Sequence, residues 1–159
     1  MLDRRWLDRS LDRSLRVLLA TVAMAMGLSQ LSPPAAAQTS AGPAVARHKV
    51  IFHVGDAEPA KWTVALNNVF NVRKDLGAAN VDIEVVAVNA GLRMLKLDSP
   101  ESSRVAEAIQ GGVRVVACEN SMKGQNITRD DLLPGLGYVA AGVVELMQRQ
   151  REGYAYIRP

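Results

Sequence analysis

The chain is 159 residues long, 48% hydrophobic and 22% charged, with a formal net charge of +3 at pH 7 and a single cysteine. Once its N-terminal segment is set aside, it is long enough for one hydrophobic core and too short for two domains. No run of Lys and Arg interleaved with aromatic residues follows that segment. The sequence therefore lacks the electrostatic footprint of nucleic-acid binding, and no nucleic-acid partner is expected.

The first 37 residues have the three parts of a secretory signal peptide. A basic stretch precedes the apolar run VLLATVAMAMGL, and PPAAAQ then supplies an A-x-A cleavage pattern. We predict cleavage after Ala37 and export to the periplasm or the exterior of a bacterium. The apolar run is shorter than the roughly 18 residues that span a bilayer, so we expect no stable membrane insertion after cleavage, with retention as an anchor as the alternative. Cleavage leaves 14 basic and 13 acidic residues, a net charge of +1.

The first half of the remaining chain begins with small and polar residues and then alternates between strand and helix patterns. Residues 38–47 are expected to form a flexible lead-in. The β-branched run at 48–54 predicts a strand. Residues 59–76 predict a helix that begins at a proline and ends before a glycine, with one apolar face formed by Trp62, Leu66, Val69, Phe70 and Leu76. Residues 81–88 predict a second strand that becomes buried, and 92–97 a short helical piece.

The second half continues the alternation. Residues 98–101 have the spacing of a capping box and predict a helix start, and 113–117 form a third apolar strand. Residues 128–131 predict another short helix with Thr128 as its cap. Strands are then expected at 138–141 and 154–157. They flank a last helix, on one side of which lie Val143, Val144 and Met147.

Strands separated by helices imply right-handed crossovers and a parallel sheet covered on both faces. We therefore predict a single α/β domain at residues 48–159, with three α/β/α layers and a mostly parallel five-stranded sheet. In such sheets, ligands bind beyond the carboxyl ends of the strands. Cys118 follows the third strand and His53 stands at the end of the first strand. The rule therefore places both residues on the edge where function is expected.

Cys118 has two interpretations. Free thiols have a pKa near 8.5 and need a nearby helix start, cation or imidazolium to become nucleophilic thiolates at neutral pH. A helix start follows Cys118, with Asn120 or Ser121 as its cap and Lys123 one turn further on, so these side chains are candidates for a binding pocket. The alternative is a small apolar residue that fills the end of the strand, because free cysteine is among the most buried residue types.

His53 is a further candidate for the pocket. If the first and third strands are neighbours, as in the strand order 2-1-3-4-5, its imidazole is placed to stabilise a Cys118 thiolate. The alternative is a hydrogen-bonded histidine at the rim of the core.

Three segments of the chain together resemble a known family. They are HKVIFHVGDAEPAKWTVALNN near the start, VACENSM followed by DLLPG, and YVAAGVVELMQRQREGYAYIRP at the end. The chain from His48 to Pro159 resembles the DsrE/DsrF-like family of small sulfur-relay proteins, in its exported branch. The resemblance implies a flavodoxin-like domain that assembles into homo-oligomers, trimers or hexamers. It also implies that Cys118 is the candidate catalytic residue, because it matches the cysteine that carries a persulfide in the family.

Other chemistries have weaker support. Cysteine hydrolase chemistry needs an oriented histidine and an oxyanion hole, and no metal-ligand spacing joins Cys118 to the histidines. No metal is therefore expected. Residues 135–140 match the dinucleotide-binding pattern G-x-G-x-x-A but follow no predicted strand, so no cofactor is expected either. The resulting hypothesis is an exported protein that binds or relays sulfane sulfur on Cys118, as a sulfurtransferase-like persulfide carrier with a donor or acceptor protein. The alternative is a non-catalytic small-molecule-binding or assembly module with a structural cysteine.

Overall fold

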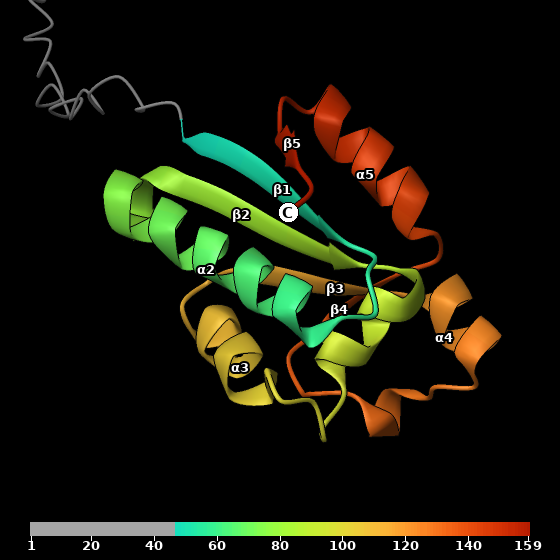
Figure 1. Cartoon of the computed structure of the whole chain (residues 1–159). Coiled ribbons are helices and arrows are strands. Elements are labelled where there is room, and N and C mark those ends of the chain that lie inside the picture. The colour runs from blue at the N-terminus through green and yellow to red at the C-terminus, as the bar shows by residue number, and fades with distance from the viewer. Residues whose placement is uncertain (1–46) are drawn as a thin grey trace, which may run out of the picture. The chain divides into compact units, whose positions relative to one another are not determined.

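The computed structural model describes residues 47–159, and the predicted signal peptide and nearly all of the lead-in lie outside this range. Within this range, five strands alternate with four α-helices (Figure 1). In chain order the elements are β1 (His48–Val54), α2 (Pro59–Leu76), β2 (Val81–Ala87), α3 (Ser102–Gln110), β3 (Arg114–Cys118), α4 (Glu119–Gln125), β4 (Gly137–Val139), α5 (Gly142–Arg151) and β5 (Ala155–Ile157). Three 3₁₀ turns complete them, η1 (Ala78–Asn80), η2 (Asn89–Leu95) and η3 (Arg129–Asp131).

All five strands are parallel and lie in the order β4-β3-β2-β1-β5. The predicted α/β class and five-stranded parallel sheet are confirmed. The chain steps from β1 to β4 in one direction and then returns to place β5 on the other side of β1. Because β2 lies between β1 and β3, the order 2-1-3-4-5 does not occur, and the first and third strands are not neighbours.

The sheet separates two apolar layers. Helices α2 and α3 cover one face and α5 covers the other (Figure 1). Alternate residues of β2 face the two sides, so Val85 packs towards α2 and Val86 towards α5. Because both faces are covered, the strands are apolar along most of their length, as the continuous runs in the sequence predicted.

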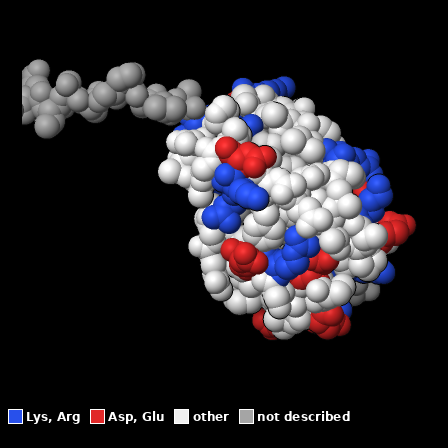
Figure 2. All heavy atoms as spheres, turned by 60° about the vertical axis from the view of Figure 1, so that its left-hand side comes forward, with Lys and Arg blue, Asp and Glu red and all other residues white. Residues whose placement is uncertain are grey.

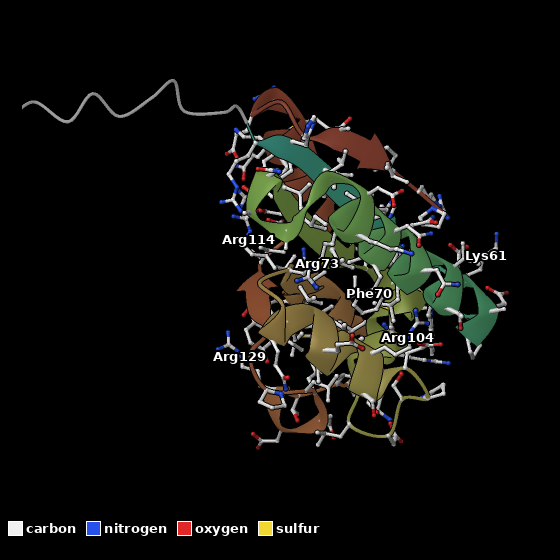
Figure 3. All side chains as sticks on the ribbon, turned by 90° about the vertical axis from the view of Figure 1, so that its left-hand side faces the viewer. Lys61, Phe70, Arg73, Arg104, Arg114 and Arg129 are labelled. Carbon is white, nitrogen blue, oxygen red and sulfur yellow. The ribbon has the colours of Figure 1, made fainter. Side chains whose placement is uncertain are left out.

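On the α2 and α3 face, a stacked cation also joins the two helices. The guanidinium of Arg104 lies 5.5 Å from the centre of the Phe70 ring, and its Nη2 donates to Asn67 Oδ1 at 2.6 Å (Figure 3). Arg104 also pairs with the buried Glu101 at 3.1 Å. Glu101 accepts a hydrogen bond from Thr63 as well and makes no side-chain cap, so the expected capping box at 98–101 is wrong and α3 begins at Ser102.

At η3 the predicted cap is present. The backbone N–H and the hydroxyl of Thr128 both donate to Asp131 Oδ2 at 2.7 Å. The Asp131 carboxylate thus supplies a partner for the Thr128 N–H, which would otherwise have none at the start of the turn.

Helix α5 covers its face of the sheet with few apolar contacts. Leu146 and Gly142 are its buried residues, whereas Val143, Val144 and Met147 share the side that faces solvent and are 72%, 41% and 45% exposed. We call these three exposed residues the α5 patch. Elsewhere on the surface, the face in Figure 2 shows positive and negative side chains interspersed. Within residues 47–159, no helix combines the length and the apolar character needed to cross a membrane.

Candidate functional site

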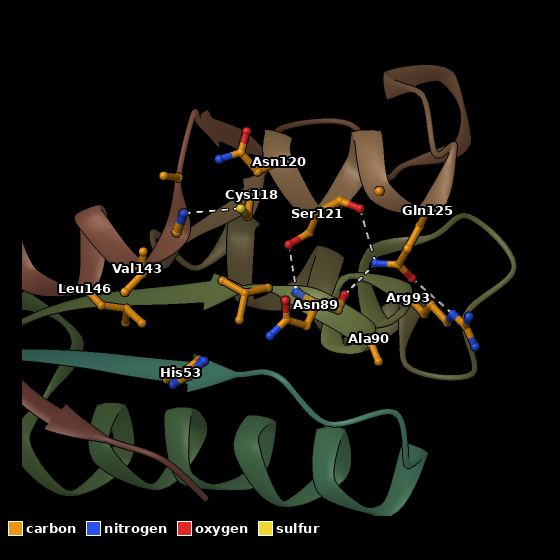
Figure 4. A pocket seen from close by; sticks show the side chains of 14 residues that line it. His53, Asn89, Ala90, Arg93, Cys118, Asn120, Ser121, Gln125, Val143 and Leu146 are labelled. Carbon is orange, nitrogen blue, oxygen red and sulfur yellow. Dashed lines mark hydrogen bonds between the residues drawn. The ribbon is translucent and has the colours of Figure 1, made fainter.

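A cleft of about 720 Å³ opens at the carboxyl edge of the sheet (Figure 4). Its walls come from the ends of β1 and β3, the turn η2 that follows β2, helix α4, and the start of α5. The lining residues are His53, Val88, Asn89, Ala90, Arg93, Cys118, Asn120, Ser121, Gly124, Gln125, Ala141, Gly142, Val143 and Leu146. The cleft lies where parallel α/β sheets bind ligands, as the sequence predicted.

Cys118 lies in the wall of this cleft. It is the last residue of β3 and the N-cap of α4, and its side chain is 5% exposed. The backbone N–H of Gly142, the first residue of α5, donates to its Sγ at 3.2 Å (Figure 4). The apolar side chains of Val86, Val116 and Leu146 belong to the same buried cluster as the thiol.

The surroundings of Cys118 act on its acidity in two directions. Burial alone raises the pKa of the thiol, because it penalises the charged form. Hydrogen bonds from the Ser121 hydroxyl and from backbone N–H groups, led by that of Gly142, outweigh the burial and lower the pKa of Cys118 below its ordinary value. The site therefore favours the nucleophilic thiolate.

Ser121 links the thiol to the turn after β2. Its Oγ accepts a hydrogen bond from the backbone N–H of Asn89 at 2.8 Å, which leaves the hydroxyl proton for the sulfur. Asn89 has a positive φ of 46°, a conformation that asparagine adopts more readily than most residues. Gln125 closes the link, because its Nε2 donates to the carbonyl of Asn89 at 2.6 Å and to that of Ser121 at 3.3 Å.

His53 lines the same cleft but lies two strands from Cys118. The intervening strand separates the two backbones by about 10 Å, so the direct contact that depended on neighbouring strands is not formed. Nδ1 of His53 is 2.7 Å from the hydroxyl of Tyr156, and within residues 47–159 the buried Nε2 has no hydrogen-bond partner. Burial and, next, the nearby Arg158 lower the pKa of His53, and Asp56 opposes them. The interpretation of a hydrogen-bonded rim histidine fits these contacts.

Of the four side chains predicted to shape the pocket, His53, Asn120 and Ser121 line the cleft with Cys118, and Lys123 does not. Lys123 is exposed on α4. It follows Ser121 by two residues, and two residues turn an α-helix by about 200°, so the two side chains leave opposite sides of α4.

Several residues of the cleft were not predicted, Gly142, Asn89, Arg93 and Gln125 among them. Asn89 follows a strand, and the strand-end rule was sufficient to find it. Nothing in the sequence marks Gly142 as a donor to sulfur, because this contact joins residues 24 positions apart through its backbone. Within the described part of the chain, no three His, Cys, Asp or Glu side chains are grouped closely enough to hold a metal ion.

A buried charge cluster lies under α5, outside the lining of the cleft. Glu84 on β2 is fully buried, and its Oε2 is 2.9 Å from Arg114 and 2.9 Å from Arg149. Tyr154 donates to Asp82 at 2.5 Å and accepts from Arg114 at 2.7 Å. Burial and, next, a hydrogen bond with Glu145 raise the pKa of Glu84 from 4.5 to about 7. This cluster ties α5 to the sheet.

The layers, the parallel sheet and the cleft at its carboxyl edge define an α/β protein with one cysteine at its candidate site. The model of the DsrE/DsrF-like family matches residues 49–159, and the chain belongs to this family. No curated protein matches the chain.

Two solved structures are similar to this chain. The protein of unknown function MTH1491 from Methanobacterium thermoautotrophicum is 39% identical with a TM-score of 0.67. The ychN protein from E. coli is 17% identical with a TM-score of 0.58, a likeness that concerns the fold alone. Each match covers 70% of this chain and 99% of the other.

Proposed function

We propose that this DsrE/DsrF-like protein binds or relays sulfane sulfur as a persulfide on Cys118. The observation that carries the proposal is the hydrogen bond from the Gly142 N–H to Sγ at 3.2 Å, in the wall of a cleft. A donor aimed at sulfur stabilises a thiolate, and the thiolate is the form that attacks a sulfur donor. Ser121 supports the same charge through its hydroxyl.

The transfer needs no oxidant from outside. The Cys118 thiolate attacks the outer sulfur of a donor persulfide, R–S–SH, and a bond forms between Sγ and that sulfur. The S–S bond of the donor breaks, its electron pair leaves with R–S⁻, and the proton stays on the transferred sulfur. In the second step, an acceptor thiolate attacks the outer sulfur of Cys118–S–SH and releases the Cys118 thiolate, which closes the cycle.

The test is an intact-mass measurement after incubation of the mature protein with inorganic polysulfide. A gain of about one sulfur mass, reversed by dithiothreitol and absent in Cys118→Ser, supports the proposal. No gain in a protein whose thiol is accessible to small alkylating reagents contradicts it.

The second candidate function is a non-catalytic binding or assembly module in which Cys118 is structural. The observation that favours it is the burial of the thiol among Val86, Val116 and Leu146. Labelling separates the two candidates. A thiol that reacts in the native protein with a pH-dependent rate supports the persulfide carrier, and a thiol that reacts only in denaturant supports the module.

We further propose that the protein is exported and works as a homo-oligomer. The signal-like N-terminal sequence supports export. The α5 patch supports assembly, because its three apolar residues adjoin one another on the solvent side of one helix. The exposed edge strand β5, with Tyr156 41% exposed, offers a second apolar contact.

A further inference from the structure

The cleft is much larger than the sulfur atom that the proposed reaction transfers. Its volume is about 720 Å³, whereas a water-sized group occupies about 30 Å³. Clefts of roughly 300–1,000 Å³ are typical of sites for small organic molecules. The space beside Cys118 therefore fits the molecule that carries the sulfur as well as the sulfur itself.

The lining of the cleft carries one positive charge and no negative charge. No aspartate or glutamate is among its lining residues, and its cationic side chain at neutral pH is Arg93, because burial first of all lowers the pKa of His53. The Arg93 Nε donates to the neutral amide oxygen of Gln125 at 3.3 Å. Within residues 47–159, no carboxylate lies within ion-pair distance of Arg93. Arg93 is exposed, so its charge remains available to an anion at the mouth of the cleft.

Two of the side chains between Cys118 and Arg93 are polar and neutral. In the view of Figure 4, Cys118 lies near the start of α5 and Arg93 lies at the other side of the cleft, with Ser121 and Gln125 between them. Ala90 and Val88 supply apolar wall on the side of the β2 turn. A ligand that spans this site has sulfur at one end, a short body that meets both polar side chains and apolar wall, and a negative charge at the other end.

We propose that the cleft binds a low-molecular-mass organic persulfide that bears a carboxylate, and the thiol that it becomes, with the carboxylate at Arg93 and the sulfur at Cys118. This inference rests on the proposed function and identifies its sulfur donor. The donor gives its outer sulfur to the Cys118 thiolate and remains as R–S⁻, so atoms and electrons balance as described above. Arg93 is a positioning residue, since it binds the carboxylate and touches neither reacting sulfur.

The experiment compares three donors by the rate at which Cys118 gains one sulfur mass. The donors are glutathione persulfide, the persulfide of glutathione diethyl ester, and inorganic polysulfide. The variants are Arg93→Gln and, as a matched control that removes the same charge outside the cleft lining, Lys123→Gln. We expect Arg93→Gln to slow loading from glutathione persulfide about tenfold, the worth of one charge-assisted hydrogen bond. The ester should load slowly in both the wild-type protein and Arg93→Gln. Loading from polysulfide should differ between these two proteins by less than about threefold, because that donor makes no carboxylate contact.

The outcomes separate this inference from the proposed function. Equal rates for the acid and the ester, or an Arg93→Gln variant that behaves like Lys123→Gln, overturn the inference while polysulfide loading leaves the function intact. Loading from polysulfide but from neither glutathione donor also overturns it. No loading from any donor overturns the function instead. Binding of unreactive S-methylglutathione to Cys118→Ser, measured by calorimetry, then tests the ligand without transfer, and its loss in Cys118→Ser/Arg93→Gln supports the inference.

Discussion

The backbone N–H of Gly142 donates to Sγ of Cys118 at 3.2 Å and joins the first residue of α5 to the last residue of β3. Gly142 permits this approach because it has no side chain. A Cβ built there lies 2.3 Å from Val88 Cγ1 and 3.3 Å from Cys118 Cβ. The same residue therefore sets both the spacing of α5 above the sheet and the acidity of the thiol.

Gly142→Ala should weaken that contact. The added methyl group must push the start of α5 away from Val88, so we expect the pKa of Cys118 to rise and the protein to lose about 1–3 kcal/mol of stability. The pH dependence of alkylation and denaturant unfolding measure the two effects. Gly124→Ala is the control for a methyl group added elsewhere in the cleft lining, because a Cβ at Gly124 meets nothing within 4 Å. An unchanged alkylation profile in Gly142→Ala would show that its N–H does not tune the thiol.

Ser121→Ala removes the hydroxyl that lowers the pKa of Cys118. We therefore expect this pKa to rise and the alkylation rate at neutral pH to fall. The variant also removes the acceptor of the Asn89 N–H, and the loss of this exposed hydrogen bond should cost about 1 kcal/mol. Ser103→Ala, at an exposed position of α3, is the matched control. Identical pH profiles for the two variants would contradict the role of Ser121.

Glu84 should make the protein less stable as the pH rises. Its folded pKa of about 7 lies above the ordinary 4.5, because burial and then Glu145 disfavour the charged form. Between these two values the folded state holds a proton that the unfolded state has released, so stability falls as pH rises through this window, by up to about 3 kcal/mol. Four carboxylates surround the two arginines of the cluster, those of Asp82, Glu84, Glu145 and Glu152.

Unfolding by urea at several pH values between 4.5 and 8 tests this expectation. Glu84→Gln keeps the shape of the side chain and removes its titration, so the fall in stability should flatten. Glu107→Gln, an exposed change on α3, should leave the pH dependence as it is. If the free energy of unfolding of Glu84→Gln falls with rising pH as steeply as that of the wild-type protein, the role of Glu84 is disproved.

Met147→Glu tests the α5 patch as an oligomer contact. Met147 is 45% exposed and stands outside the lining of the cleft, so a charge here should dissociate an assembly without touching Cys118. We expect light scattering to give an oligomer for the mature protein and a smaller species for the variant. Gln148→Glu adds the same charge at a neighbouring exposed position and should leave the mass of the oligomer unchanged. A monomeric mature protein would refute the assembly.

The strands and the edge that carries the cleft were predictable from sequence, because buried parallel strands are apolar throughout and ligands bind beyond their carboxyl ends. Strand order was not, since pairing depends on contacts between distant segments. Thus His53 shares the cleft with Cys118 yet lies across β2 from it. Lys123 was assigned from its distance along the chain, whereas its place on the helix turns it away.

The backbone donor to the thiol, Gly142, also escaped prediction. A backbone N–H carries no sequence signal, and glycine at 142 was readable only as a helix neighbour. Glu84 looked like an ordinary polar residue in an alternating strand. Its full burial follows from the position of α5, which no local pattern specifies.

Helix α5 is attached to the sheet by polar contacts at both of its ends. Gly142 binds the Cys118 thiol at the first turn, and Arg149 binds Glu84 at 2.9 Å in the last. Between them Leu146 is the buried apolar side chain. The Cys118 thiol and the Glu84 carboxyl group are therefore joined through one helix, and we expect a partner that tilts α5 to change the reactivity of the sulfur.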